Sequence, residues 1–391
     1  MNILYTYTDK LKGHDLIWAF LEEGYKLQPY IRSFNAVEKG EEYENLKNEL
    51  IAYIKEHSYD AVISWNYFPL VSDACEATGI PYMSWIFDHP LLHVFSKNMH
   101  NSCNHIFVFD RIFTDKLKAL GANAYHLPLG VNTSRLSGLV ITDEDIAEYS
   151  NDMAFVGSLY QRNPYNKVKL PELIREKFDN LFIKQLGDWH NNYIYDETTD
   201  EDLEIFEKLV PIDGRENFPY ISTKELYMGF FLARKYAQTE REYVLGRLAE
   251  NFNITLYNSE DDKSVLKGVV CKNAVGYETQ APKVYFSTKI NLNFTIKSIE
   301  SGLPLRVFDI MGVGGFLLSN YQAEFDQLYE PGKEVELFSS FEELEDKAAF
   351  YLRHEKERLT IAMNGYKRTC AEHTMRQRVH KMMEITFGRQ L

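Results

Sequence analysis

The residues best suited to chemistry stand in one C-terminal segment, KINLNFTIKSIESGLPLRVFDIMGVGGFLLSN, which runs from Lys289 to Asn320. Its pattern predicts a strand, a helix and a second strand. Arg306 and Asp309 are three positions apart, so they share one face of the predicted helix. A carboxylate there can accept hydrogen bonds from a ribose diol, while Arg306 or Lys289 can neutralise a diphosphate. The segment therefore predicts a nucleotide-sugar site.

Two turns that contain glycine extend this candidate site. FVGSLY ends a predicted strand at Gly157, where the missing Cβ lets the backbone approach a phosphate, and Ser158 can donate a hydrogen bond. Gly314 and Gly315 form the bend between the predicted helix and the next strand. Each turn alone is common, and the spacing of the charged pair alone favours an exposed ion pair beside an ordinary helix end.

Polar residues also follow predicted strands in the N-terminal half. In WIFDHP, Asp88 and His89 come directly after a buried strand, and ligands of open α/β sheets bind at that edge. Either side chain could remove a proton from a substrate hydroxyl, Asp88 being the better placed. The alternative is that Asp88 caps the next segment and His89 is a loop histidine. Asn66 and Asp110 end two other strands and could face a substrate or stabilise turns.

The elements that must position these residues follow an α/β rhythm. Short apolar runs alternate with amphipathic stretches through the first 130 residues, which predicts βαβ units with parallel strands. The sequence turns polar near residues 132–151, and a new strand signal follows in MAFVGSLY. Residues 165–252 are predicted to be largely helical, and strand signals return in KINLNF, GFLLS and EVELF. We therefore expect two α/β domains.

Composition excludes several other classes of protein. The 391 residues include 43 Lys and Arg against 57 Asp and Glu, and the net charge of −14 argues against nucleic acid as the main partner. No apolar stretch is long enough for a membrane span, and the four scattered cysteines favour reduced thiols in the cytoplasm. The acidic clusters at 196–202 and 259–263 are predicted to be solvated loops, so we expect no metal site.

Taken together, the motifs resemble the CgeB-like, spore-maturation type of glycosyltransferase, with a group 1-like C-terminal domain. The resemblance rests on MAFVGSLY, YFSTKINLNFT, GLPLRVFDIMGVGGFLLSNY, YEPGKEVELF, YLRHEKERLTIAMNGY and EHT, and upstream on WNYFPLVSDACEATGIPYMSWIFDHP and NHIFVFDR. It implies a GT-B fold, in which two Rossmann-like domains face each other across a cleft and the second binds a nucleotide-diphosphate sugar. Such enzymes generally need no metal.

With this resemblance the chain divides at residue 150. Residues 1–150 are expected to form the acceptor-side domain. Residues 151–375 form the nucleotide-sugar-binding domain, with a helical insertion at about 165–252. Residues 376–391 are expected to form a helix that packs back on the first domain.

The resemblance also adds donor-side residues. It suggests that Arg241, in QTEREYVLG, faces the cleft, although a solvated helix charge is the plainer interpretation. Tyr277, in VGYETQAPK, could stack on the nucleobase or serve in packing. Asn293, at the end of KINLN, completes the donor-binding set. Related retaining transferases often carry two glutamates eight positions apart, whereas Glu300 and Asp309 are nine apart here.

The predicted function is that of a metal-independent hexosyltransferase without a cofactor. It would move a sugar from a nucleoside diphosphate, such as a UDP-sugar, to a glycan, protein or other acceptor, with Asp88 or His89 as the base and Asn66 and Asp110 on the acceptor side. Two alternatives stay open, since a fold does not determine its chemistry. One is a nucleotide-sugar epimerase or hydrolase on the same fold, and the other is a non-catalytic scaffold that binds nucleotide.

Overall fold

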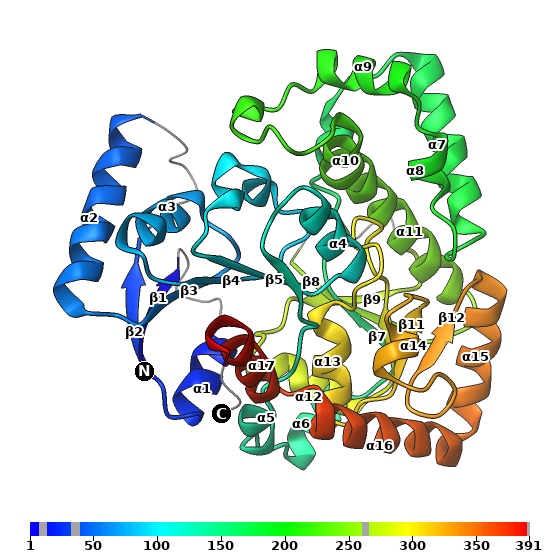
Figure 1. Cartoon of the computed structure of the whole chain (residues 1–391). Helices are drawn as coiled ribbons and strands as arrows, with labels where there is room; N and C mark the ends of the chain where they lie inside the picture. The colour runs from blue at the N-terminus through cyan, green and yellow to red at the C-terminus, as the bar shows by residue number, and fades with distance from the viewer. Residues whose placement is uncertain (8–13, 33–39, 260–265, 389–391) are drawn as a thin grey trace.

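The computed structural model describes residues 1–7, 14–32, 40–259 and 266–388, which form two lobes (Figure 1). The N-terminal lobe contains a parallel sheet with the strand order β2-β1-β3-β4-β5-β6. Its strands are β1 (Asn2–Tyr7), β2 (Lys26–Ile31), β3 (Ala61–Trp65), β4 (Tyr82–Ile86), β5 (Asn104–Val108) and β6 (Ala124–His126). The helices between them are α1 (His14–Glu22), α2 (Glu41–His57), α3 (Pro69–Thr78) and α4 (Arg111–Ala119).

The C-terminal lobe contains a second parallel sheet, with the order β12-β11-β10-β7-β8-β9. Its strands are β7 (Asn151–Val156), β8 (Ile254–Asn258), β9 (Val270–Asn273), β10 (Thr288–Asn293), β11 (Leu317–Asn320) and β12 (Glu336–Phe338). Numbered within the lobe this is the doubly wound order 3-2-1-4-5-6, in which the winding direction reverses between the first and fourth strands. The reversal lies between β7 and β10, and ligands of such sheets bind at that point.

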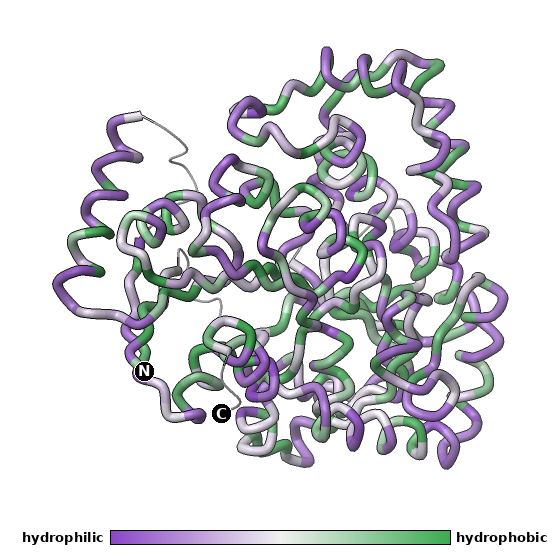
Figure 2. The backbone as a smooth tube through the Cα atoms, in the orientation of Figure 1, coloured by the Kyte–Doolittle hydropathy of each residue, from purple (hydrophilic) through white to green (hydrophobic). Residues whose placement is uncertain are grey.

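The helices of the C-terminal lobe enclose this sheet. Two short helices link the lobes, α5 (Thr133–Ser137) and α6 (Asp143–Tyr149). The others beyond the insertion are α11 (Ala233–Leu248), α12 (Gln280–Ser287), α13 (Leu305–Gly312), α14 (Phe325–Leu328), α15 (Phe341–Arg353), α16 (Glu355–Glu372) and α17 (Met375–Phe387). Hydrophobic residues run along the central strands, whereas an outer helix such as α2 carries many hydrophilic residues (Figure 2).

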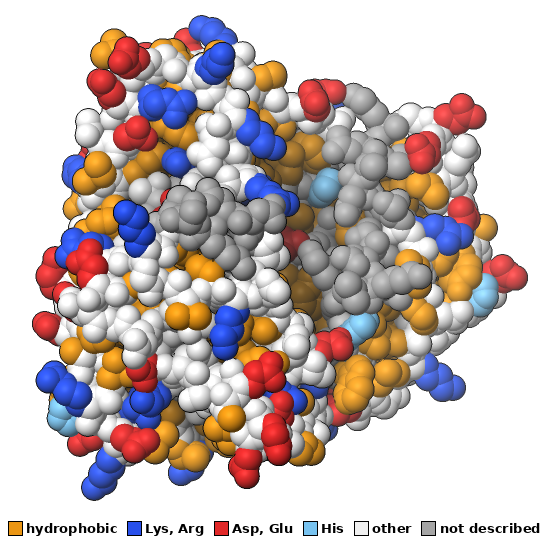
Figure 3. Space-filling model, turned by 180° about the vertical axis from the view of Figure 1, so that it is seen from behind, with side chains coloured by type: hydrophobic (Ala, Val, Ile, Leu, Met, Phe, Trp, Pro, Cys, Tyr) orange, Lys and Arg blue, Asp and Glu red, His pale blue; other side chains and the backbone are white. Residues whose placement is uncertain are grey.

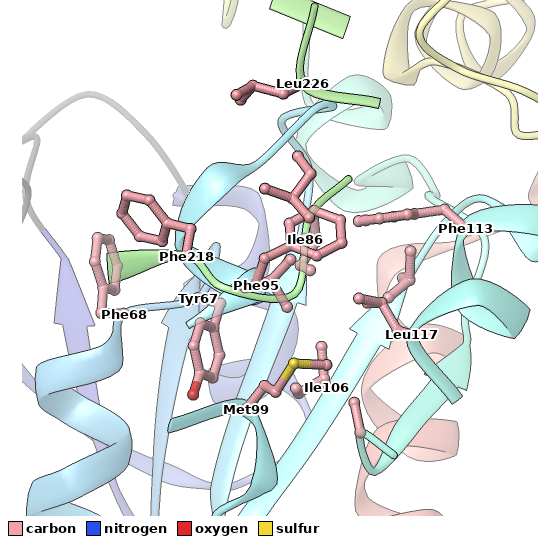
Figure 4. Packing of buried hydrophobic residues seen from close by; sticks show 14 of the residues in the cluster. Tyr67, Phe68, Ile86, Phe95, Met99, Ile106, Phe113, Leu117, Phe218 and Leu226 are labelled. Carbon is pink, nitrogen blue, oxygen red and sulfur yellow. The ribbon is translucent and has the colours of Figure 1, made fainter. Parts of the chain in front are cut away.

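The helical insertion lies between β7 and α11. It contains α7 (Glu172–Leu186), α8 (Tyr193–Glu197), α9 (Asp200–Leu209) and α10 (Thr223–Tyr227), and a π-helical turn, Met228–Leu232, leads into α11. The insertion belongs to the C-terminal lobe by sequence but shares a hydrophobic cluster with the N-terminal lobe. Figure 4 shows its Phe218 near Phe95 and Ile86 of that lobe. The insertion therefore bridges the two lobes.

A second hydrophobic cluster also joins the lobes. It combines N-terminal residues such as Trp85 and Phe107 with Val307 and Phe308 of α13. Seen from behind, the surface between the lobes is hollowed, and hydrophobic side chains line part of the hollow (Figure 3). The lobes thus share buried contacts beside an open cleft.

The last described helix returns to the N-terminal lobe. α17 packs against α1, and Arg376 pairs with Glu23. Just before α17, the chain pairs with the segment that leaves the N-terminal lobe, since Val131 and Thr374 form an isolated parallel bridge.

Candidate donor site

Four residues predicted for the donor site meet at the point where the second sheet reverses its winding. Gly157 and Ser158 follow β7, Asn293 ends the neighbouring strand β10, and Arg306 lies in the first turn of α13. Parallel neighbours end at the same edge, so the turn after β7 and the end of β10 must lie together. The Arg306 guanidinium donates a 2.8 Å hydrogen bond to the Asn293 side-chain oxygen.

Arg241 of α11 joins this group from the other side. Its guanidinium donates to the backbone carbonyls of Ser158 and Phe294, the latter at 2.8 Å. Both guanidinium groups lie over the ring of Phe155, at 5.1 Å for Arg241 and 4.9 Å for Arg306. The structure therefore gathers two cations around one aromatic ring.

Glycine at position 157 is required by this arrangement. A Cβ built there would lie 2.7 Å from a terminal nitrogen of Arg306, closer than side chains tolerate. Ser158 accepts a hydrogen bond from the Tyr160 amide, which closes the turn after the strand. The turn thus leaves room for the guanidinium to stand beside its backbone.

Arg306 has no carboxylate partner within the part of the chain that the structure describes. Among the described residues its polar contacts include the amide oxygen of Asn293 but no acidic group within ion-pair distance. A half-buried cation without a counter-charge is a favourable site for an anion, because the ligand supplies the charge that the protein omits. A phosphate is the anion that this donor geometry suits.

Asp309, one turn after Arg306 on α13, contacts the N-terminal lobe instead of open solvent. The hydroxyl of Tyr277 lies 3.2 Å from Asp309 and 3.0 Å from Asp15 of α1. Burial, followed by the charge of Asp15, raises the pKa of the Asp309 carboxyl to about 7. The carboxyl of Asp309 therefore holds its proton much more readily than that of an exposed aspartate.

Tyr277 is held by the same contacts. Its hydroxyl contacts Asp15 and Asp309, while 42% of the residue stays exposed. The guanidinium of Arg135 lies 5.0 Å from the ring centre and covers part of the ring. Stacking on a nucleobase thus stays a prediction for this ring.

The structure does not bring Lys289, Gly314 and Gly315 to the cations. Lys289 is the second residue of β10, at the opposite edge of the sheet, and its ammonium pairs with Asp152 at 2.7 Å. Asn293 lies four positions further along the strand, or roughly 13 Å away. Gly314 and Gly315 follow the far end of α13, and a Cβ on Gly315 would meet the Tyr285 carbonyl at 2.7 Å. Those glycines serve the turn into β11, and donor contacts of all three residues stay a prediction.

In the N-terminal lobe, Asn66 and Asp88 do come together. The Asn66 side chain donates to the Asp88 carboxylate at 2.8 Å and accepts from the backbone N–H groups of Phe87 and Asp88. Asn66 has a left-handed backbone with φ of 66° and is buried, whereas Asp88 is exposed. Asn66 therefore fixes the loop that presents Asp88 at the carboxyl end of β4, and it is not itself open to a substrate.

Asp110 is a contact between the lobes. Its carboxylate accepts hydrogen bonds from the N–H groups of Glu300, Ser301 and Gly302, at 2.7, 2.9 and 3.1 Å. Burial opposes its ionisation, but His89 and backbone donors outweigh burial and lower the pKa of Asp110. Asp110 is fully buried in this contact between the lobes, and its place on the acceptor side stays a prediction.

His89 faces a small cavity between the lobes and the insertion. Its ring packs edge-on against Phe113 and lines a cavity of about 50 Å³ between the lobes and the insertion. Burial lowers the pKa of His89 to about 4, so the ring is neutral at pH 7. Within the described part of the chain, neither ring nitrogen has a hydrogen-bond partner. Of the two candidate bases, Asp88 is the accessible one.

The acidic cluster at 196–202 stabilises the start of a helix. Thr199 and Asp202 form a capping box at the start of α9, and Asp202 also pairs with Lys177. Most of the second cluster, residues 260–263, lies outside the described residues. Across residues that the structure describes, no group of three His, Cys, Asp or Glu side chains is arranged to hold a metal ion.

Sequence reasoning missed Asp15 and Arg135. The Arg135 guanidinium binds both oxygens of Asp15, at 2.8 and 2.9 Å, and Asn132 donates to the same carboxylate at 3.0 Å. Asp15 stands in the first turn of α1 in HDLIW, an ordinary position for an acid. Only the folded arrangement places it beside Asp309, so no local signal could have identified it.

Comparison with known proteins agrees with this architecture. Residues 238–384, which lie in the C-terminal part of the chain, match the protein family described as glycosyl transferase-like. Sucrose-phosphate synthase from Thermosynechococcus elongatus superposes with a TM-score of 0.58 at 9% identity, over 98% of each chain. HepE from Anabaena in complex with UDP-glucose superposes with a TM-score of 0.58 at 9% sequence identity, over 100% of each chain.

The fold is GT-B. A glycosyltransferase from Rickettsia africae has the same fold, with a TM-score of 0.62 at 9% identity over 98% of this chain and 97% of its own. The two sheets and the cleft confirm the predicted pair of Rossmann-like lobes. No curated protein matches the sequence. None of the described helices combines the length and the apolar character that crossing a bilayer requires.

Proposed function

We propose that this chain is a hexosyltransferase that moves a sugar from a nucleoside diphosphate to an acceptor bound by the N-terminal lobe. The observation that carries the proposal is the Arg306 cation beside Gly157, which has no acidic partner among the described residues and lies at the winding reversal of the C-terminal sheet. The match of residues 238–384 to a glycosyl transferase-like family supports it. UDP-glucose in the HepE complex favours a UDP-sugar as donor. The motifs in the sequence favour the CgeB-like branch.

Catalysis would depend on stabilising the departing diphosphate. Negative charge grows on the leaving oxygen as the glycosidic bond breaks, and fixed donors aimed at it lower the barrier. Arg306 and the backbone near Gly157 would supply this stabilisation, while Arg241 orients the turn by binding the Ser158 carbonyl. Asp309 would accept hydrogen bonds from the ribose.

The acceptor would approach from the N-terminal lobe. The exposed Asp88 carboxylate, fixed by Asn66, is the proposed base if the reaction inverts the anomeric carbon. We propose that no metal takes part, because the two arginines can carry the charge role that a cation has in other transferases. The four cysteines are free thiols, which supports a cytoplasmic location.

A donor screen tests the proposal. UDP-, GDP- and dTDP-linked sugars are incubated with candidate glycans, with and without a chelator, and nucleotide release and products are measured. We expect turnover that needs an acceptor and that survives chelation. A sugar isomer or free sugar formed equally well without acceptor would instead indicate an epimerase or hydrolase, and binding without turnover would indicate a scaffold.

We expect Arg306→Ala to lower kcat about a hundredfold, because it removes ~3 kcal/mol of transition-state stabilisation. Lys289→Ala is the matched control. It also removes one cation, but this cation lies on β10 at the far edge of the sheet. Its kcat should stay within about twofold of wild type. Equal effects of the two substitutions would remove Arg306 from the site.

A further inference from the structure

Two carboxyl groups from opposite lobes share one hydroxyl group next to the proposed donor site. Asp15 belongs to the N-terminal lobe and Asp309 to the C-terminal lobe, and the Tyr277 oxygen lies 3.0 Å and 3.2 Å from them. Asp15 and Asp309 are each only 6% exposed. Like charges this close and this buried cannot both be ionised without a large cost.

Counting protons shows which group must carry the extra one. Asp15 already accepts two N–H bonds from Arg135 and one from Asn132, so it is stable as a carboxylate. Tyr277 has a single O–H and can donate it to only one carboxyl group. Among the described residues, Tyr277 is also the one hydrogen-bond partner of Asp309. The arrangement is fully satisfied when Asp309 is protonated and donates to Tyr277, which in turn donates to Asp15.

We propose that Asp15 and Tyr277 are positioning residues that hold Asp309 protonated until a nucleotide ribose displaces that proton. This rests on the proposed function, in which Asp309 receives the ribose diol. The diol donates hydrogen bonds, so it needs the carboxylate and not the acid. Binding then releases the Asp309 proton to solvent, and the Tyr277 hydroxyl remains on Asp15.

The charged and titratable surroundings of Asp309 support this order of events. Burial and Asp15 raise the pKa of Asp309 to about 7, while Arg135, the Tyr277 hydrogen bond and Arg306 act in the opposite direction. Tyr285 of α12 also faces this group, and burial keeps its phenol protonated. The proton should therefore be present below pH 7 and absent well above it.

The expected signature is proton release linked to binding. Calorimetric titration with UDP-glucose is run at pH 6 and pH 8 in buffers of different ionisation enthalpy. Phosphodiester groups of this ligand do not titrate in that range. We expect close to one proton released at pH 6 and almost none at pH 8, with about tenfold weaker binding at pH 6. Binding that is independent of pH would overturn the inference but leave the proposed function intact.

Two conservative substitutions test whether Asp15 causes the pH dependence of UDP-glucose binding. Asp15→Asn removes the neighbouring charge, so its affinity at pH 6 should approach that at pH 8. Asp152→Asn is the matched control, since it removes one carboxylate elsewhere in the molecule, and it should keep the tenfold difference. An unchanged pH dependence in Asp15→Asn would contradict the role of Asp15.

Tyr277→Phe keeps the ring but removes the hydroxyl. We expect it to bind UDP-glucose at least as tightly as wild type. Weaker binding would mean that the hydroxyl contacts the nucleotide directly, which would overturn its positioning role. GDP-mannose and dTDP-glucose are titrated in the same way. Failure of all three nucleotide sugars to bind would overturn the proposed function, and this inference with it.

Discussion

Single residues around the donor site are constrained by close packing more than by charge alone. Gly157 shows this clearly, because its missing side chain is the space that the Arg306 guanidinium occupies. The residue is neither charged nor polar, yet it determines where a cation stands. The same holds for Gly302, where a Cβ would lie 2.8 Å from the Phe109 ring at the contact between lobes.

We expect Gly157→Ala to lower kcat/KM by about tenfold or more while the fold is kept. The guanidinium is the flexible end of a side chain, so it can move aside at little cost in stability, but a shift of about 1 Å can cost up to a hundredfold in rate. Steady-state kinetics and a thermal melt check this.

Gly246→Ala on α11 is the control for that substitution. Its Cβ would enter open space, so it should leave the rate unchanged and leave stability unchanged or slightly higher. A rate loss in both variants would show that the effect is not specific to the donor site.

At the scale of elements, the insertion is stabilised by the lobe to which it does not belong in sequence. Phe218 is 1% exposed and packs with the ring of His93 and the cluster around Phe95. Gly229, in the π-helical turn, lies so close to Pro90 that a Cβ would meet its ring at 2.7 Å. The insertion therefore limits how far the lobes can separate.

We expect Phe218→Ala to lower the free energy of unfolding by about 3–5 kcal/mol, as for other fully buried phenylalanines. Denaturant unfolding measures this, and limited proteolysis of residues 187–222 reports whether the insertion has detached. Phe350→Ala, at a residue that is 41% exposed, should cost much less. Similar losses in both would contradict the docking of the insertion on the N-terminal lobe.

The sequence predicts the central strands, whereas it predicts the edge strands only in part, since EVELF indicates β12 but no run indicates β2 or β9. The apolar runs of β3, β4, β5 and β7 are visible because both faces of those strands are covered. β2 and β9 each lie at an edge of a sheet, mix polar with apolar residues that are mostly exposed or half-buried, and give no such run. Neither was predicted.

The candidate site divides in the same way. Gly157, Asn293 and Arg306 could be predicted because strand ends and helix starts on one sheet edge are local features. Lys289 was placed in the site by its charge, although a residue that begins a strand must lie at the opposite edge. The pairing of Asp15 with Asp309 depends on how the lobes meet, and no local pattern encodes that.

At the scale of the whole molecule, Asp110 connects the lobes through three backbone N–H groups of the loop before α13. We expect Asp110→Asn to lower stability by about 2 kcal/mol at pH 7, because the amide leaves buried donors without acceptors. The pKa of Asp110 is lowered in the fold, so its contribution is present above the unfolded pKa and is lost as pH falls through the folded value.

Unfolding measured from pH 7 down to pH 3 checks this expectation. The difference between Asp110→Asn and wild type should shrink towards the acid end of that range. A constant difference at all pH values would mean that the charge of Asp110 does not contribute.

The return of α17 to the N-terminal lobe means that the backbone passes between the lobes twice, at Val131 and again at Thr374, and the two passages are paired with each other. A single connecting segment would allow two lobes to move relative to each other in any direction. Two connections that are paired side by side act as a hinge, so the lobes can rotate about one axis but cannot move apart. Each time the lobes close, the same surfaces of the two lobes therefore meet in the same alignment.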